Sequence, residues 1–92
     1  MTGLATSLRE RLTLALQPQQ LQVRDDSALH AGHAGAREGA HFAVHIVSPL
    51  FAGVPTIQRH RMVYAAAAPL MAGRIHALQI TALTPEETGD PS

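Results

Sequence analysis

A helix-forming segment lies between two segments with the alternation of strands, and this order restricts the chain to few folds. Residues 56–68, TIQRHRMVYAAAA, end in strong helix formers, with Thr56 as the expected N-cap and Pro69 as the expected stop. The flanking segments, His41–Ser48 and Ile75–Ala82, alternate apolar and polar residues as half-buried strands do. Two strands joined through a helix are expected to be parallel, with a right-handed crossover.

The N-terminal half adds one helix and one strand. A leucine every fourth residue predicts an amphipathic helix that ends at Pro18, with Thr2 or Ser7 as its N-cap; the stripe is Leu4, Leu8, Leu12 and Leu16. Residues 20–25, QLQVRD, then alternate as a strand and are stopped by Asp25, Asp26 and Ser27. If the following loop is a hairpin, this strand is antiparallel to the next.

The predicted fold class is therefore α+β, a small sandwich with the element order α-β-β-α-β. Its three-stranded mixed sheet should carry the helices on one face. A chain of 92 residues forms one domain at most. We place that domain at residues 1–85 and interpret residues 86–92 as a polar, acidic, disordered tail.

Composition excludes several classes of function. The chain has no cysteine, which removes thiol catalysis and self-contained cluster binding, and no serine lies in a nucleophile motif. We therefore expect no enzyme. Seven basic residues balance seven acidic ones, whereas strong phosphate binders are more basic. The N-terminus lacks a signal-peptide pattern and no apolar run could span a bilayer, so we expect a soluble, cytoplasmic protein without membrane contact.

Histidine is concentrated in and around a long loop. Residues 28–40 are rich in glycine and alanine and contain His30 and His33, and loops of this length tend to be functional or disordered. Farther along, His41 and His45 are about 13 Å apart on one strand face, so they could not easily join a zinc site and are interpreted as surface residues. Spacing alone makes His76 a partly buried residue on the face of Leu78 and Ile80.

Four segments, in this order and spacing, resemble the BolA family. They are DDSALHAGHAG, HFAVHIVSPLFAG, RHRMVYAAAAPLM and IHALQITALTPEE. The resemblance runs from about Leu8 to Glu87. Its most specific parts are the F-x-G of Phe51–Gly53 followed by R-H-R-x-V-Y at Arg59–Tyr64, and the I-H-A-L around His76.

The resemblance implies a BolA-like fold similar to the class II KH domain, and a monothiol glutaredoxin as partner in a heterodimer. It implies a shared [2Fe–2S] cluster, to which the glutaredoxin cysteine and glutathione supply thiolates. This chain would supply His76 and a loop histidine, either His30 or His33. The isolated chain would bind no cofactor, and its role would be iron–sulfur cluster assembly, trafficking or iron sensing.

The alternative function is DNA-binding transcription regulation through the KH-like or helix-turn-helix surface. Its candidate contacts are Arg24, Arg59, Arg61 and Arg74, and binding should be weak and salt-sensitive. Arg59 and Arg61 are about 200° apart around a helix and cannot share one contact face. One of the two should face solvent, while the other holds an acid or a helix end.

Overall fold

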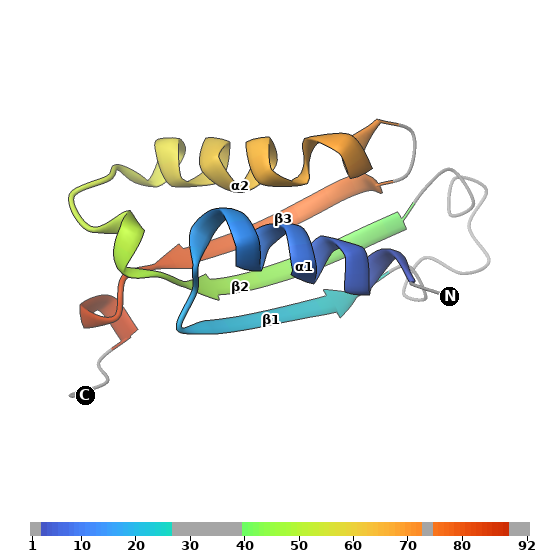
Figure 1. Cartoon of the computed structure of the whole chain (residues 1–92). Helices are drawn as coiled ribbons and strands as arrows, with labels where there is room; N and C mark the ends of the chain where they lie inside the picture. Colours follow the sequence, from blue (N-terminus) through green and yellow to red (C-terminus); the bar gives the residue numbers. More distant parts are fainter. Residues whose placement is uncertain (1–2, 27–39, 73–74, 89–92) are drawn as a thin grey trace.

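The computed structural model describes residues 3–26, 40–72 and 75–88. Two α-helices and three strands account for most of them, in the order that the sequence predicted (Figure 1). The elements are α1 (Leu4–Leu16), β1 (Gln20–Asp25), β2 (Ala40–Val47), the 3₁₀ helix η2 (Pro49–Phe51), α2 (Thr56–Met71), β3 (Ile75–Leu83) and the 3₁₀ helix η3 (Glu86–Thr88).

The sheet is mixed and has the order β1-β2-β3. Strand β1 pairs with β2 in the antiparallel sense, from Gln20 opposite Val47 to Asp25 opposite Phe42. Strand β2 pairs with β3 in the parallel sense, as expected for strands joined through α2. The predicted fold class is confirmed in both pairings. As a consequence, β1 ends at the same end of the sheet at which β2 and β3 begin (Figure 1).

Both helices cover one face of the sheet, and the core lies between the two layers (Figure 1). The leucine stripe of α1 is buried at Leu8, Leu12 and Leu16, as the four-residue spacing predicted. The sheet and α2 complete the core with Phe42, Val44, Ile46, Phe51, Val63, Ala67, Leu70, Ile75, Leu78 and Ala82.

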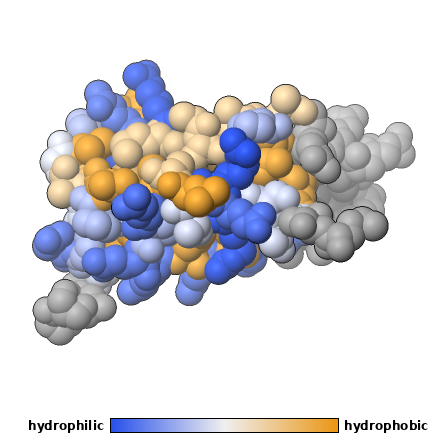
Figure 2. Space-filling view, viewed as in Figure 1, coloured by the Kyte–Doolittle hydropathy of each residue, from blue (hydrophilic) through white to orange (hydrophobic). Residues whose placement is uncertain are grey.

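The helical side of the surface mixes apolar and hydrophilic residues (Figure 2). Among the described residues, the exposed large apolar side chains are separated along the chain: Leu14, Leu50, Ile57 and Tyr64. Among the helices of the described residues, none has both the length and the apolar character needed to cross a membrane.

The helix ends differ from the sequence prediction. Gly3 is the N-cap of α1, rather than Thr2 or Ser7, and no side-chain hydrogen bond caps it. Pro55 precedes α2 in the N-cap position expected for Thr56. The predicted stop at Pro69 is also wrong, because α2 continues to Met71 with Pro69 inside it. Proline has a helical φ and removes one hydrogen bond, so a last turn that buries Leu70 in the core can tolerate it.

Ser48 fastens the end of β2 to the end of α1. It is fully buried, and its hydroxyl donates to the carbonyl of Leu16 at 2.6 Å and accepts from the amide of Leu50 at 3.1 Å. Gly53 follows in the turn before α2 with a φ of 75°, a conformation that glycine adopts without steric cost. These contacts fix the position at which α2 begins over the sheet.

The expected boundary at Pro85 lies too early, because Glu86–Thr88 form η3 rather than part of a disordered tail. The Thr84 hydroxyl accepts from the Glu87 amide at 3.2 Å, while the Glu87 carboxylate accepts from the Thr84 amide at 2.8 Å. This reciprocal pair is a capping box, whose T-x-x-E pattern is present in TPEE. The carboxylate also receives two hydrogen bonds from Arg59, at 2.5 and 3.1 Å, which tie η3 to α2.

Candidate metal centre

His76 lies exposed at the second residue of β3. This is the end of the sheet at which β1 stops and β2 starts, so the connection between β1 and β2 is attached beside it (Figure 1). The ring is not in the interior, where it would be unable to meet a second protein. The alternative interpretation from spacing, a partly buried ring along the Leu78 and Ile80 face, is wrong.

A β-bulge explains the exposure of His76. Ala40 pairs with Ile75 and His41 pairs with Ala77, so β3 advances by two residues where β2 advances by one. His76 is the extra residue. A bulge changes the direction of a side chain, and bulges are common next to functional sites. Here it lets Ile75 and Leu78 remain buried at 3% and 8% exposure while the imidazole between them turns to solvent.

The bulge also brings His76 next to His41, a neighbour that the sequence did not predict. The two ring centroids are 5.2 Å apart and the ring planes are inclined by 43°. His41 is half-buried at the start of β2. The alternation of the sequence correctly placed His41 and His45 on one face of β2. It could not predict that His76 lies beside His41, because this depends on a shift in the register between β2 and β3.

The connection that carries the other predicted ligands is anchored at this same place. The amide of Asp26 donates to the carbonyl of His41 at 2.7 Å, which holds the two ends of the connection together. His30 and His33 themselves lie outside the described residues. Within residues 3–26, 40–72 and 75–88, no three His, Cys, Asp or Glu side chains gather as a metal site would require.

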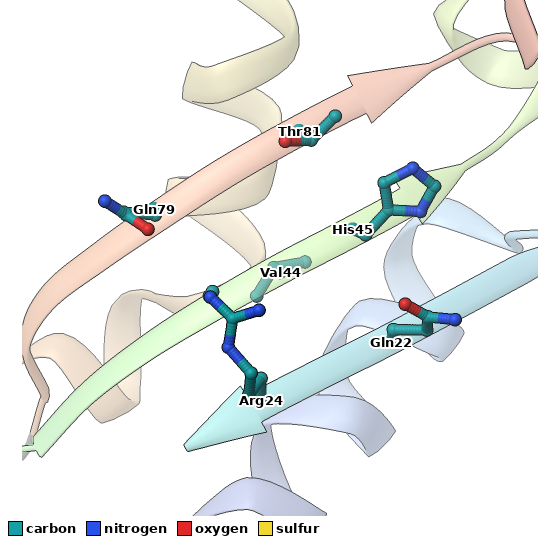
Figure 3. A pocket seen from close by; sticks show the side chains of 7 residues that line it. Gln22, Arg24, Val44, His45, Gln79 and Thr81 are labelled. Carbon is teal, nitrogen blue, oxygen red and sulfur yellow. The ribbon is translucent and has the colours of Figure 1, made fainter. Parts of the chain in front are cut away.

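The face of the sheet opposite the helices has a hollow of about 320 Å³, lined by both polar and apolar residues. Figure 3 shows Gln22 and Arg24 of β1, His45 of β2, and Gln79 and Thr81 of β3 projecting on the side away from the helices. His76 does not line this hollow. His41 does not line it either.

On α2, the two arginines proposed for DNA contact differ in exposure and do not form one surface. Arg59 is buried at 8% exposure and donates to the carbonyls of Val54 at 2.6 Å and Ala82 at 3.0 Å, in addition to its ion pair with Glu87. The hydrogen bonds to Glu87 raise the pKa of Arg59. Arg61 is exposed on the same helix. This is the division that their spacing predicted, with one arginine in solvent and one holding an acid.

Arg24 is already engaged by an acid. Arg24 is exposed but donates to Asp26 at 2.6 and 3.1 Å, and this contact raises the pKa of Arg24. Arg74 lies outside the described residues. Sequence reasoning missed Glu87 as the partner of Arg59, although the T-x-x-E signal for a folded turn was present.

Comparison with known proteins identifies close relatives in sequence and in structure. BolA-like protein 1 of Pongo abelii is 42% identical over 86 residues, which cover 94% of this chain and 61% of that protein. SufE-like protein 1, chloroplastic/mitochondrial, of Arabidopsis thaliana is 41% identical over 86 residues, or 87% of this chain and 23% of that protein. The chain thus spans about three fifths of the first relative and about a quarter of the second.

The solved structure of BolA1 from Arabidopsis thaliana superposes with a TM-score of 0.82 at 37% identity, over 95% of this chain and 98% of that one. The family model described as BolA-like protein matches residues 12–87, close to the span from Leu8 to Glu87 that carried the resemblance. The predicted family is thus confirmed by sequence and by fold. The chain belongs to the BolA-like protein family.

Proposed function

We propose that this chain is a non-enzymatic binding module that docks on a monothiol glutaredoxin and completes a shared [2Fe–2S] cluster. His76 supplies one ligand, and His30 or His33 supplies the second. The observation that carries the proposal is the exposed imidazole of His76, turned outward by a bulge at the end of the sheet where the β1–β2 connection is attached. Membership of the BolA-like family supports the same role.

The donor chemistry of the chain fits half of such a cluster. A [2Fe–2S] cluster takes four ligands, and imidazole replaces thiolate on one iron in known centres, which raises the reduction potential. The chain contains no cysteine, so nitrogen is what it can offer, and the thiolates must come from the cysteine of the glutaredoxin and from glutathione. Bound there, the cluster would supply redox-active iron. The residues of this chain would fix two nitrogen donors in place.

Chain length permits a loop histidine to reach His76. His30 follows Asp26 by four residues, which span at most roughly 14 Å when extended. The distance from β1 across β2 to β3 is two strand spacings, roughly 10 Å. His33, seven residues from both Asp26 and Ala40, has a longer reach. Both histidines therefore remain candidates for the second ligand.

The DNA-binding alternative gains no support from the described residues. Arg59 is engaged with Glu87 and two carbonyls, so it cannot contact phosphate without breaking the contacts that hold α2 to β3 and η3.

A cytoplasmic location remains a prediction, since the names of some relatives state that those proteins are chloroplastic or mitochondrial.

A spectroscopic titration tests the proposed function. The purified chain is mixed anaerobically with cluster-loaded monothiol glutaredoxin, and visible absorption and circular dichroism are recorded. A changed cluster spectrum is expected for the unsubstituted chain and for His45→Ala, since His45 is on the same strand face as His41 but far from His76. The change should be lost in His76→Ala. An unchanged spectrum with the unsubstituted chain, or a full change with His76→Ala, contradicts the proposal.

The same titration identifies the loop ligand. His30→Ala and His33→Ala are compared one at a time, and the variant that loses the altered spectrum identifies the second donor. Acidification provides an additional check, because protonated imidazole cannot bind metal. The mixed cluster should therefore be more acid-labile than the glutaredoxin cluster with thiolate ligands alone.

A further inference from the structure

His41 and His76 belong to different strands, and the bulge in β3 brings their rings together. The ring centroids are 5.2 Å apart. If β3 kept back to His76 the register that holds from Ala77 onward, His76 would lie opposite Ala40, on the other face of the sheet from His41. The backbone of both strands holds the pair, since β2 and β3 continue in register for six further residue pairs after Ala77, up to Val47 opposite Leu83.

The separation of the rings suits a shared metal ion. Two imidazoles that bind one tetrahedral ion at Zn–N distances of about 2.1 Å have ring centroids roughly 5 Å apart. The observed 5.2 Å is close to this value.

We infer that His41 and His76 form a two-imidazole site for a divalent transition-metal ion such as Zn²⁺ or Co²⁺. Imidazole nitrogen is a preferred donor for these ions. In the described part of the chain no third His, Cys, Asp or Glu completes a group of donors, so the remaining coordination positions are open to water or to a donor from another molecule. The site goes beyond the proposed function, since it needs neither glutaredoxin nor the loop histidines.

The inferred site and the proposed cluster share His76, but only the inferred site requires His41. An ion held by the pair and the proposed cluster would both use the ring of His76. Excess Zn²⁺ should therefore compete with cluster sharing. The sequence interprets His41 as a strand-surface residue that, with His45 about 13 Å away, could not easily join a zinc site. The structure gives His41 a different neighbour, His76.

The test uses the full chain alone, at neutral pH, with Zn²⁺ as the probe. Nuclear magnetic resonance of the histidine side chains should show the ring signals of His41 and His76 shifting together and those of His45 unmoved. This reading is made on the unsubstituted protein and so does not depend on whether a variant folds. Shifts confined to His30 and His33, or spread equally over all six histidines, overturn the inference.

Calorimetric titration of variants gives the second reading. His41→Ala and His76→Ala should each weaken Zn²⁺ binding by roughly tenfold or more, since even outer-shell partners of metal-binding histidines contribute factors of 10–100. His45→Ala should bind as the unsubstituted chain does. Full affinity in His41→Ala, or loss of binding only when His30 and His33 are both replaced, overturns the inference. Because glutaredoxin is absent, neither result depends on the outcome of the cluster titration.

Discussion

Arg59 and Arg61 show what spacing alone can predict for single residues. Two residues apart on a helix, they had to face different directions, and Arg59 is indeed buried while Arg61 is exposed. The acid that Arg59 binds could not be predicted, because Glu87 lies 28 residues away in a segment whose composition suggested disorder. A guanidinium that contacts two carbonyls and a carboxylate, and lies 5.9 Å from the Phe51 ring centroid, joins α2, β3, η2 and η3.

The ion pair makes stability depend on pH in the acidic range. Hydrogen bonds from Arg59 and from the Thr84 amide lower the pKa of Glu87 from 4.5 to about 2. Since the folded-state pKa is depressed, the stabilisation is complete above the unfolded value of 4.5 and is lost as the pH falls toward 2. Glu87→Gln should therefore be less stable than the unsubstituted chain at neutral pH, and the difference should shrink below pH 4.5. Urea unfolding over this pH range measures it.

Glu86→Gln is the matched control, since Glu86 is the exposed neighbour of Glu87 in η3. It should follow the unsubstituted chain at each pH. A difference between Glu87→Gln and the unsubstituted chain that stays constant from neutral pH down to pH 2 would show that the carboxylate charge does not contribute.

The helices and strands agree with the sequence prediction wherever the periodicity of apolar residues is strong. The leucines of α1 and the alternation of β2 gave both the type and the buried face of each element correctly. The bulge at His76 could not be predicted. An alternating sequence shows which residues of a strand are apolar and which are polar, but it does not show where the pairing register of two strands shifts. The extension of α2 through Pro69 was also missed, since the tertiary contact of Leu70 outweighs a local stop signal.

A substitution of Ser48 tests how the end of β2 is joined to the end of α1. Ser48→Ala removes a buried hydroxyl that donates to Leu16 and accepts from Leu50, and an unpaired buried group costs about 1–3 kcal/mol. Chemical denaturation should show a loss of stability of this size. Ser7→Ala, within α1, should cost little, because alanine is the better helix former. Equal stability of Ser48→Ala and the unsubstituted chain would mean that other contacts fix this junction.

At the scale of the whole molecule, a single helical layer on a three-stranded sheet leaves a thin core. Leu12 is fully buried at the centre of α1, whereas Leu14 of the same helix is 81% exposed. Leu12→Ala should lower the free energy of unfolding by about 2–5 kcal/mol, and Leu14→Ala should have little effect. Since small domains have modest total stability, Leu12→Ala should also show a markedly lower thermal midpoint by circular dichroism. Similar midpoints for the two variants would contradict the assigned layer packing.

The chemistry proposed for the molecule belongs to one end of the two-layer arrangement. The start of β3, the start of β2 and both ends of the β1–β2 connection meet there, and α1 and α2 cover a different surface (Figure 1). The sequence predicted His76 as a ligand through the resemblance of its motif. The proximity of His41 to His76 could not be predicted, because it depends on how β2 and β3 pair.

Nitrogen coordination of the shared cluster is tested most directly by pulsed electron paramagnetic resonance. The chain is labelled with ¹⁵N and combined with unlabelled, cluster-loaded monothiol glutaredoxin, and the cluster is then reduced. Strong ¹⁵N couplings from two histidine nitrogens of this chain are expected, with the coupling of His76 absent in His76→Ala and retained in His45→Ala. A reduced mixed cluster that shows no ¹⁵N coupling to this chain would contradict the account.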